Sequence, residues 1–126
     1  MSNKSILVVD DNPLNIKMVR MLLVREGYDV STATSADEAL SVLQRVRPQL
    51  ILMDIQMPGM DGLELTKRLK SDPDTSNIIV IALTAHAMKG EKEKILDGGC
   101  DDYVSKPFDI HALLAVIAKH LRSDAP

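Results

Sequence analysis

The chain of 126 residues carries a net charge of −3 at pH 7, and 45% of its residues are hydrophobic. These values suit one folded domain with one core. They disfavour nucleic acid and anionic membranes as partners, because both are bound by basic surfaces. No apolar run approaches the length that spans a bilayer, we expect no signal peptide, and the single cysteine excludes an internal disulfide, in keeping with a cytoplasmic protein.

The first part of the chain alternates short apolar runs with helical patterns. We expect a strand at Ile6–Val9, a continuous apolar run typical of a strand covered on both faces. A helix is expected from Pro13, which suits a first helical turn, to Glu26, with Gly27 ending it. Weak alternation over Tyr28–Ala33 predicts the second strand.

The middle of the chain repeats this alternation. Ser35 and Glu38 have the spacing of a capping box, which predicts the start of the second helix. The apolar run Leu50–Met53 predicts the third strand, and Asp61 is expected to cap the third helix. The polar stretch Ser71–Asn77 then predicts a surface loop.

The last part of the chain contains two further strand-and-helix units. Ile78–Leu83 is the strongest strand pattern, and a short charged helix is expected at Met88–Leu96, closed by Gly98 and Gly99. Tyr103–Val104 predicts a short fifth strand, after which Asp109 can cap a last helix with one apolar face.

Five strand-then-helix units indicate an α/β fold with a parallel sheet and helices on both faces. We therefore expect a (βα)5 doubly wound, flavodoxin-like three-layer sandwich with the strand order 2-1-3-4-5. We expect residues 1–126 to form a single domain whose core covers about 4–121.

Polar residues stand at the ends of four predicted strands. In such a sheet ligands bind beyond the carboxyl ends of the strands, where the strand order reverses between the first and third strands. Asp10 and Asp11 end the first strand, and Asp54 ends the third. Thr84 ends the fourth strand, and Lys106 follows the fifth. The two acidic strand ends are therefore expected to be neighbours.

Such an acidic cluster needs a cation. Carboxylates within about 5 Å of one another repel by a few kcal/mol per pair at an effective dielectric of about 20. Oxygen ligands without His or Cys favour Mg²⁺. A phosphoryl group would satisfy the site, because the metal and Lys106 neutralise its oxygens while Thr84 donates a hydrogen bond. Asp54, alone on its loop, is the best candidate for the nucleophile.

Four motifs in this order and spacing resemble the receiver domain of bacterial two-component response regulators. The motifs are "VVDDN" at the first strand end, "LMDIQMPGMDG" around Asp54, "ALTA" at the fourth strand and "YVSKPF" at the fifth. The resemblance covers roughly Lys4 to Leu121, and it implies a phosphorylation-controlled binding module rather than an enzyme with turnover.

The resemblance implies specific roles for the acidic residues. Asp54 is expected to accept a phosphoryl group from the phosphohistidine of a histidine kinase or histidine phosphotransfer protein. Asp11 and Asp54 are expected to ligate Mg²⁺ directly, together with the backbone carbonyl of Gln56. Asp10 is expected to act on the metal through water.

The resemblance also implies roles for residues near the other strand ends. Lys106 is expected to pair with a phosphoryl oxygen, Thr84 to move towards another, and Tyr103 to swing inward behind it. The Lys106–Pro107 peptide bond is expected to be cis. For His86, an exposed helical residue is at least as good an interpretation as a residue that lines the path of attacking water.

Phosphorylation adds negative charge and acceptor oxygens. We therefore expect it to change the conformation of the face formed by the fourth helix, fifth strand and fifth helix, and thereby to control the binding of a downstream protein effector.

The chain resembles both the receivers of hybrid kinases and stand-alone receivers, some of which relay cell-division and cell-fate signals. Whether it is a stand-alone protein or part of a hybrid kinase is left open. We expect a monomer or weak dimer.

Three other classes of protein fit the sequence less well. An aspartate-nucleophile phosphohydrolase usually carries a second acid two residues after the nucleophile, where this chain has Gln56. A flavin-binding domain of the same fold needs a loop that accepts phosphate after the first strand, whereas Asp10 and Asp11 would repel one. A purely structural scaffold would not need polar groups at these strand ends.

The first helix carries more apolar residues than one buried face needs. We expect its inner face to contain Met18, Val19, Leu22 and Leu23. Outside that face lie four further apolar residues, Leu14, Ile16, Met21 and Val24. They are either ordinary exposed residues or, as we prefer, a docking face for a kinase helical bundle. Unchanged phosphotransfer to an Ile16→Asp variant would argue against docking.

Overall fold

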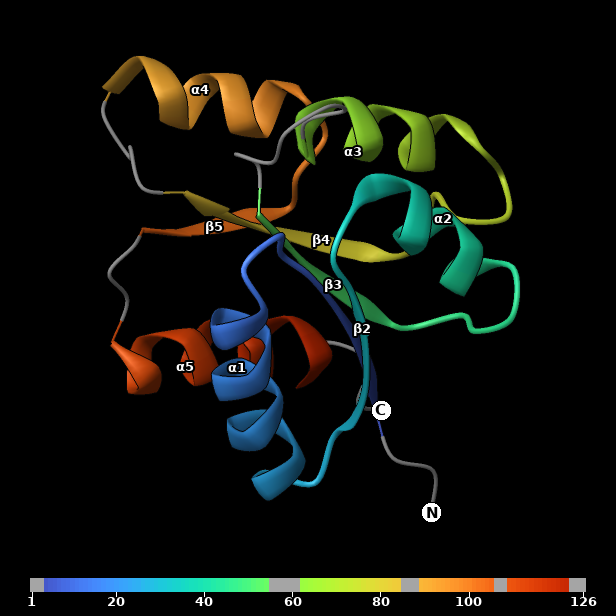
Figure 1. Ribbon diagram of the computed structural model, residues 1–126. Coiled ribbons are helices and arrows are strands. Elements are labelled where there is room, and N and C mark those ends of the chain that lie inside the picture. Colours follow the sequence, from blue (N-terminus) through green and yellow to red (C-terminus); the bar gives the residue numbers. More distant parts are fainter. Residues whose placement is uncertain (1–3, 55–61, 85–88, 106–108, 123–126) are drawn as a thin grey trace.

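A five-stranded parallel sheet runs through the centre of the computed structural model, which describes residues 4–54, 62–84, 89–105 and 109–122 (Figure 1). The strands are β1 (Ser5–Val9), β2 (Asp29–Ala33), β3 (Leu50–Asp54), β4 (Ile79–Thr84) and β5 (Asp102–Ser105). Their order is β2-β1-β3-β4-β5, and every neighbouring pair is parallel. The predicted doubly wound, flavodoxin-like fold is confirmed.

Helices cover both faces of this sheet (Figure 1). They are α1 (Pro13–Arg25), α2 (Ala36–Leu43), α3 (Gly62–Ser71), α4 (Lys89–Asp97) and α5 (Ile110–Arg122). α1 and α5 lie on one face, and α2, α3 and α4 lie on the other (Figure 1). Among the described residues, none of the helices has both the length and the apolar character required to cross a membrane.

Side chains of the central strands alternate between two hydrophobic cores. Along β1, Leu7 and Val9 belong to the core under α2, α3 and α4, whereas Ile6 and Val8 belong to the core under α1 and α5. Successive residues of a strand point to opposite faces, so a strand covered on both faces is apolar throughout. This explains why the sequence of β1 reads as an unbroken apolar run.

The start of α1 is fixed by a capping residue. The side-chain oxygen of Asn12 accepts a hydrogen bond from the backbone N–H of Leu14 at 2.9 Å, and Pro13 occupies the first helical position. The helix ends one residue earlier than expected, with Glu26 as its C-cap, and Gly27 follows with a φ of +94°. That left-handed conformation suits glycine.

α2 begins at the predicted cap, although the capping interaction differs from the expected box. The Ser35 hydroxyl accepts a hydrogen bond from the backbone N–H of Glu38 at 3.1 Å. The Glu38 carboxylate accepts one from the backbone N–H of Thr34 at 2.6 Å, one residue before the Ser35 N–H expected in a capping box. The carboxylate therefore anchors the β2–α2 connection rather than the cap residue itself.

The buried face of α1 differs from the expected one. Ile16 is only 9% exposed and packs in the same core as Val19 and Leu23, whereas Met18 is 46% exposed. The expectations that Met18 faces inward and that Ile16 faces outward were therefore wrong. Periodicity alone allows two overlapping apolar stripes on this helix, and packing against β1 and α5 selects the one that contains Ile16.

Candidate functional site

Three carboxylates converge at the carboxyl ends of β1 and β3. Asp10 directly follows β1, Asp54 is the last residue of β3, and Asp11 follows Asp10. One carboxylate oxygen from each of the three lies within 4.8 Å of the others. Asp10 and Asp54 are buried, with 2% and 3% exposure, whereas Asp11 is exposed. The predicted convergence of acids from two strand ends is confirmed.

The register of the sheet explains why these acids meet. Val9 pairs with Met53 across the β1–β3 ladder, so the next residues along the two strands are Asp10 and Asp54. The backbone N–H of Asp10 also donates to the carbonyl of Ala33 at 3.1 Å, which holds the end of β1 beside the end of β2. In a parallel sheet, the acids are brought together by the ladder itself rather than by a loop.

The first turn of α1 holds the carboxylate of Asp10. The backbone N–H of Asn12 donates to Asp10 Oδ1 at 2.9 Å, and Nδ2 of Asn15 lies 3.5 Å from Asp10 Oδ2. Neither contact was predicted from the sequence. Two signals could have indicated them: an aspartate side chain often accepts the backbone N–H two residues further on, and Asn15 places an amide side chain in the first turn of α1.

Thr84 stands at the end of the neighbouring strand. Asp54 pairs with Leu83 across the β3–β4 ladder, and Thr84 is the next residue and the last of β4. Its side chain is fully buried. Thr84 therefore lies one strand away from Asp54 at the same edge of the sheet.

Tyr103 lies on β5, on the side of the sheet that α2, α3 and α4 cover. It pairs with Ala82 and packs against the core to which Ala82 belongs. Strand alternation puts the Thr84 side chain on the same side of the sheet as Ala82. The residues expected to act together in the switch thus share one side of the sheet.

The remaining predicted site residues fall outside the described ranges. These are Gln56, Lys106, Pro107 and His86. The predicted cap Asp61 is also outside them.

The acidic cluster can hold a hard divalent cation. Two carboxylates about 5 Å apart at an effective dielectric of about 20 repel each other by about 3 kcal/mol, and a bound cation removes that cost. Asp10, Asp11 and Asp54 offer only oxygen, the ligand type that Mg²⁺ prefers. The residues present therefore fit Mg²⁺.

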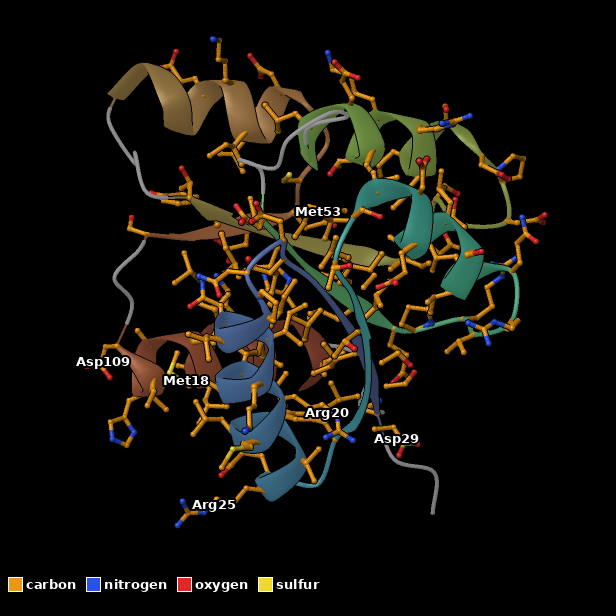
Figure 2. All side chains as sticks on the ribbon, viewed as in Figure 1. Met18, Arg20, Arg25, Asp29, Met53 and Asp109 are labelled. Carbon is orange, nitrogen blue, oxygen red and sulfur yellow. The ribbon has the colours of Figure 1, made fainter. Side chains whose placement is uncertain are left out.

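A second surface feature lies beside this site on α1 and the start of α5. Its side chains, which are apolar except for Lys17, form a shallow hollow of about 260 Å³, which we call the α1–α5 patch. The patch is lined by Leu14, Lys17, Met18, Met21, Leu22 and Ile110. Figure 2 shows Met18 projecting from α1, and Met18 lines the hollow together with Ile110, the first residue of α5.

A family model described as the response regulator receiver domain matches residues 6–118. The chain belongs to the response regulator receiver domain family. This receiver domain is 46% identical over 118 residues to the polar-differentiation response regulator DivK of Brucella anthropi, covering 94% of this chain and 96% of that protein. DivK of Brucella ovis matches with the same identity and coverage.

Solved structures of other receiver domains have the same fold. The chemotaxis response regulator CheY4 of Vibrio cholerae superposes with a TM-score of 0.88 at 29% identity, covering 94% of this chain and 98% of that one. The receiver domain of a sensor histidine kinase from Pseudomonas aeruginosa has a TM-score of 0.84 at 32% identity, covering 94% and 97%. That structure is described with a magnesium ion coordinated in its active site cleft.

Family membership establishes the general role of this receiver domain. Receiver domains act in two-component signalling as phospho-accepting switches and are generally not classical enzymes. They bind Mg²⁺ at an acidic pocket, and they interact with histidine kinases and downstream effectors. The acidic cluster of Asp10, Asp11 and Asp54 is compatible with that Mg²⁺ site.

Proposed function

We propose that Asp54 accepts a phosphoryl group from the phosphohistidine of a histidine kinase or phosphotransfer protein in a reaction that depends on Mg²⁺. The observation that carries this proposal is the convergence of Asp10, Asp11 and Asp54, whose ligand atoms lie within 4.8 Å of one another. Asp54 is the buried acid at the strand end itself, and a carboxylate there can act as a nucleophile.

Asp11, Asp54 and the backbone carbonyl of Gln56 would hold the Mg²⁺ ion, with Asp10 acting through water. The ion would supply positive charge against the acceptor carboxylate and the incoming phosphoryl oxygens. Burial of Asp10 and Asp54 supports this arrangement, because a buried carboxylate is costly unless a cation or hydrogen-bond donors compensate it. The magnesium ion described for the Pseudomonas aeruginosa receiver supports the same choice of metal.

Phosphorylation would change the conformation of the protein surface through three residues, Lys106, Thr84 and Tyr103. Lys106 would pair with one phosphoryl oxygen, and the Thr84 hydroxyl would donate to another. Because Thr84 and Tyr103 share a side of the sheet with α4, movement of Thr84 towards the phosphoryl group would let Tyr103 swing inward. The proposed output surface is the face of α4, β5 and α5, which would bind the downstream effector.

The α1–α5 patch is the proposed docking surface for the phosphodonor. Leu14 is 75% exposed and Met21 is 63% exposed, and both lie on the helix that starts beside the acidic cluster. Exposed apolar residues gathered in one patch indicate an interaction site more often than isolated ones do. A helical bundle seated there would bring its phosphohistidine to the strand ends.

The relatives suggest the biological setting. The Brucella relatives are polar-differentiation response regulators, and this chain spans nearly their whole length. We therefore propose that residues 1–126 form one receiver domain, monomeric or weakly dimeric, that relays a cell-fate or cell-division signal. Its cytoplasmic location remains a prediction.

Intact-mass analysis after incubation with acetyl phosphate tests the central proposal. Wild type should gain the mass of one phosphoryl group in Mg²⁺ and none in EDTA, and Asp54→Ala should gain none. Asp29→Ala, which removes an exposed aspartate at the start of β2, is the matched control and should behave as wild type. Absence of the adduct on wild type, or an adduct of equal yield on Asp54→Ala, would overturn the assignment of Asp54.

A further inference from the structure

Both oxygens of the Asp10 carboxylate face donors from the first turn of α1. Oδ1 accepts the backbone N–H of Asn12 at 2.9 Å, and Oδ2 lies 3.5 Å from Nδ2 of Asn15. Asp10 is 2% exposed, so the orientation of its carboxylate is set by protein groups rather than by bulk water. The first turn of α1 therefore helps to decide where these two oxygens point.

Of these two donors, only Asn15 acts through its side chain. The Asn12 contact uses a backbone N–H, and the Asn12 side chain is engaged in capping α1 through Leu14. Nearly any residue at position 12 could supply that backbone donor. The contact to Oδ2 instead requires an amide side chain, so it depends on which residue stands at position 15.

The chemistry of an amide suits this position. Helical side chains tilt towards the N-terminus of their helix, so a residue in the first turn of α1 can reach back to the strand end. A lysine or arginine at position 15 would neutralise Asp10 and compete with a metal ion, and an acid would add a further negative charge. An asparagine orients the carboxylate while leaving its charge available.

We propose that Asn15 is a positioning residue for the Mg²⁺ site, acting through Asp10. This inference rests on the proposed function, because it requires the acidic cluster to bind Mg²⁺. Groups that orient the residues around a metal typically change metal affinity by 10- to 100-fold when they are removed. The 3.5 Å separation is longer than the usual N–H···O distance, and Asp10 is proposed to act through water. We therefore expect a smaller effect, roughly three- to tenfold.

Calorimetric titration of the unphosphorylated protein with MgCl₂, in the absence of any phosphodonor, tests the inference. Asn15→Ala should raise the Mg²⁺ dissociation constant roughly three- to tenfold. Gln44→Ala, which removes an exposed amide at the end of α2, is the matched control and should leave the constant unchanged. Urea denaturation in EDTA should show that both variants are folded, so that the affinity change is separated from a loss of stability.

A second measurement uses wild type alone. The side-chain amide signal of Asn15 in an NMR spectrum should shift on addition of MgCl₂, whereas that of Gln44 should not. An Asn15 signal that does not respond, or an unchanged Mg²⁺ affinity in folded Asn15→Ala, would overturn the role of Asn15 and leave the proposed function standing. Failure of wild type to bind Mg²⁺ would instead refute the proposed function itself.

Discussion

Nε2 of His120 lies 2.9 Å from Oδ2 of Asp102, and this contact joins α5 to the edge strand β5. The other carboxylate oxygen of Asp102 accepts the backbone N–H of Tyr103 at 2.9 Å. Both side chains of the pair are mostly buried, with 20% and 24% exposure. One carboxylate thus links the last helix to the strand that carries the proposed switch tyrosine.

Loss of this link should destabilise the fold. His120→Ala is expected to lower the free energy of unfolding by about 1 kcal/mol, because it removes a partly buried hydrogen bond and leaves Asp102 with one partner fewer. Urea denaturation measures this change. His111→Ala on the same helix, whose side chain is exposed, should stay within about 0.5 kcal/mol of wild type. Equal losses for the two variants would show that the pair contributes nothing specific.

The α1–α5 patch should affect phosphotransfer without affecting stability. Leu14→Ala removes a side chain that is 75% exposed, so its free energy of unfolding should stay within about 0.5 kcal/mol of wild type. Phosphotransfer from a cognate phosphohistidine protein should slow, whereas phosphorylation by acetyl phosphate should not change. A rate from the protein donor equal to that of wild type would remove Leu14 from the docking surface.

Ile16 cannot serve as the test of docking, because it lies in the core. Ile16→Ala should instead lower the free energy of unfolding by about 2–5 kcal/mol, as truncation of a buried isoleucine usually does. The contrast between Leu14 and Ile16, two residues apart on one helix, distinguishes the docking surface from the packed face. Denaturant titration of the two variants side by side measures it.

Thr84 should be required for the switch more than for phosphorylation. Thr84→Val keeps the shape of a fully buried side chain but removes its hydroxyl, so the variant should still gain a phosphoryl group on Asp54. The change in amide hydrogen exchange that phosphorylation causes in α4 and β5 should be lost. Thr32→Val, on the edge strand β2, is the control and should retain the change. A full exchange response in Thr84→Val would contradict the proposed switch.

Repulsion among the carboxylates of the acidic cluster should destabilise the folded protein when no metal ion is bound. Asp11→Asn removes one of three neighbouring negative charges, so the protein in EDTA should become more stable, by less than about 1 kcal/mol because Asp11 is exposed. The further stabilisation by Mg²⁺ should shrink, because a ligand is lost. Urea midpoints in EDTA and in saturating Mg²⁺ give both values, with Asp29→Asn as control. A variant that is less stable in EDTA would argue against repulsion in the cluster.

The Cys100 thiol should lower the stability of the fold at alkaline pH. Burial raises the pKa of the Cys100 thiol above its ordinary value of 9.0; the hydrogen bond with Thr66 lowers it in part, the Asp101 carboxylate raises it further, and Lys70 partly offsets that. This pKa is higher in the folded state than in the unfolded state. The contribution of the thiol to the free energy of unfolding is therefore fully present below the unfolded-state pKa, and it is lost as the pH rises through the folded-state pKa.

The unfolding free energy of wild type should therefore fall more steeply above about pH 9 than that of Cys100→Ala. The comparison is between slopes, since truncation also changes the absolute stability. Other groups that titrate at alkaline pH are common to both proteins and cancel. Parallel slopes would show that the thiol does not contribute.

The sequence predicted the order of the strands and helices and the convergence of Asp10, Asp11 and Asp54. Continuous apolar runs marked the central strands because both faces of the sheet are covered, and polar residues at their ends marked the edge where Asp10, Asp11 and Asp54 meet. The boundaries of all five strands, β1 to β5, differ from expectation by a residue at one or both ends. Terminal residues pair in the ladder whatever their hydropathy.

Contacts between distant elements could not be predicted in the same way. Nζ of Lys70 at the end of α3 lies 2.9 Å from Oδ2 of Asp101, and that same oxygen accepts the backbone N–H of Val80 at 2.8 Å. Lys70 and Asp101 are ordinary surface residues in the sequence. Only the packing of α3 against the sheet brings them together.

Local patterns determined where strands and helices form and which acids end the strands, because backbone preference and hydrophobic periodicity act over a few residues. Tertiary structure decided which stripe of α1 is buried, which carbonyls and carboxylates Lys70 and His120 reach, and that Asn15 faces Asp10. These outcomes depend on how whole helices pack against the sheet. That packing is determined by burial over the entire core, and no short segment of sequence contains enough information to predict it.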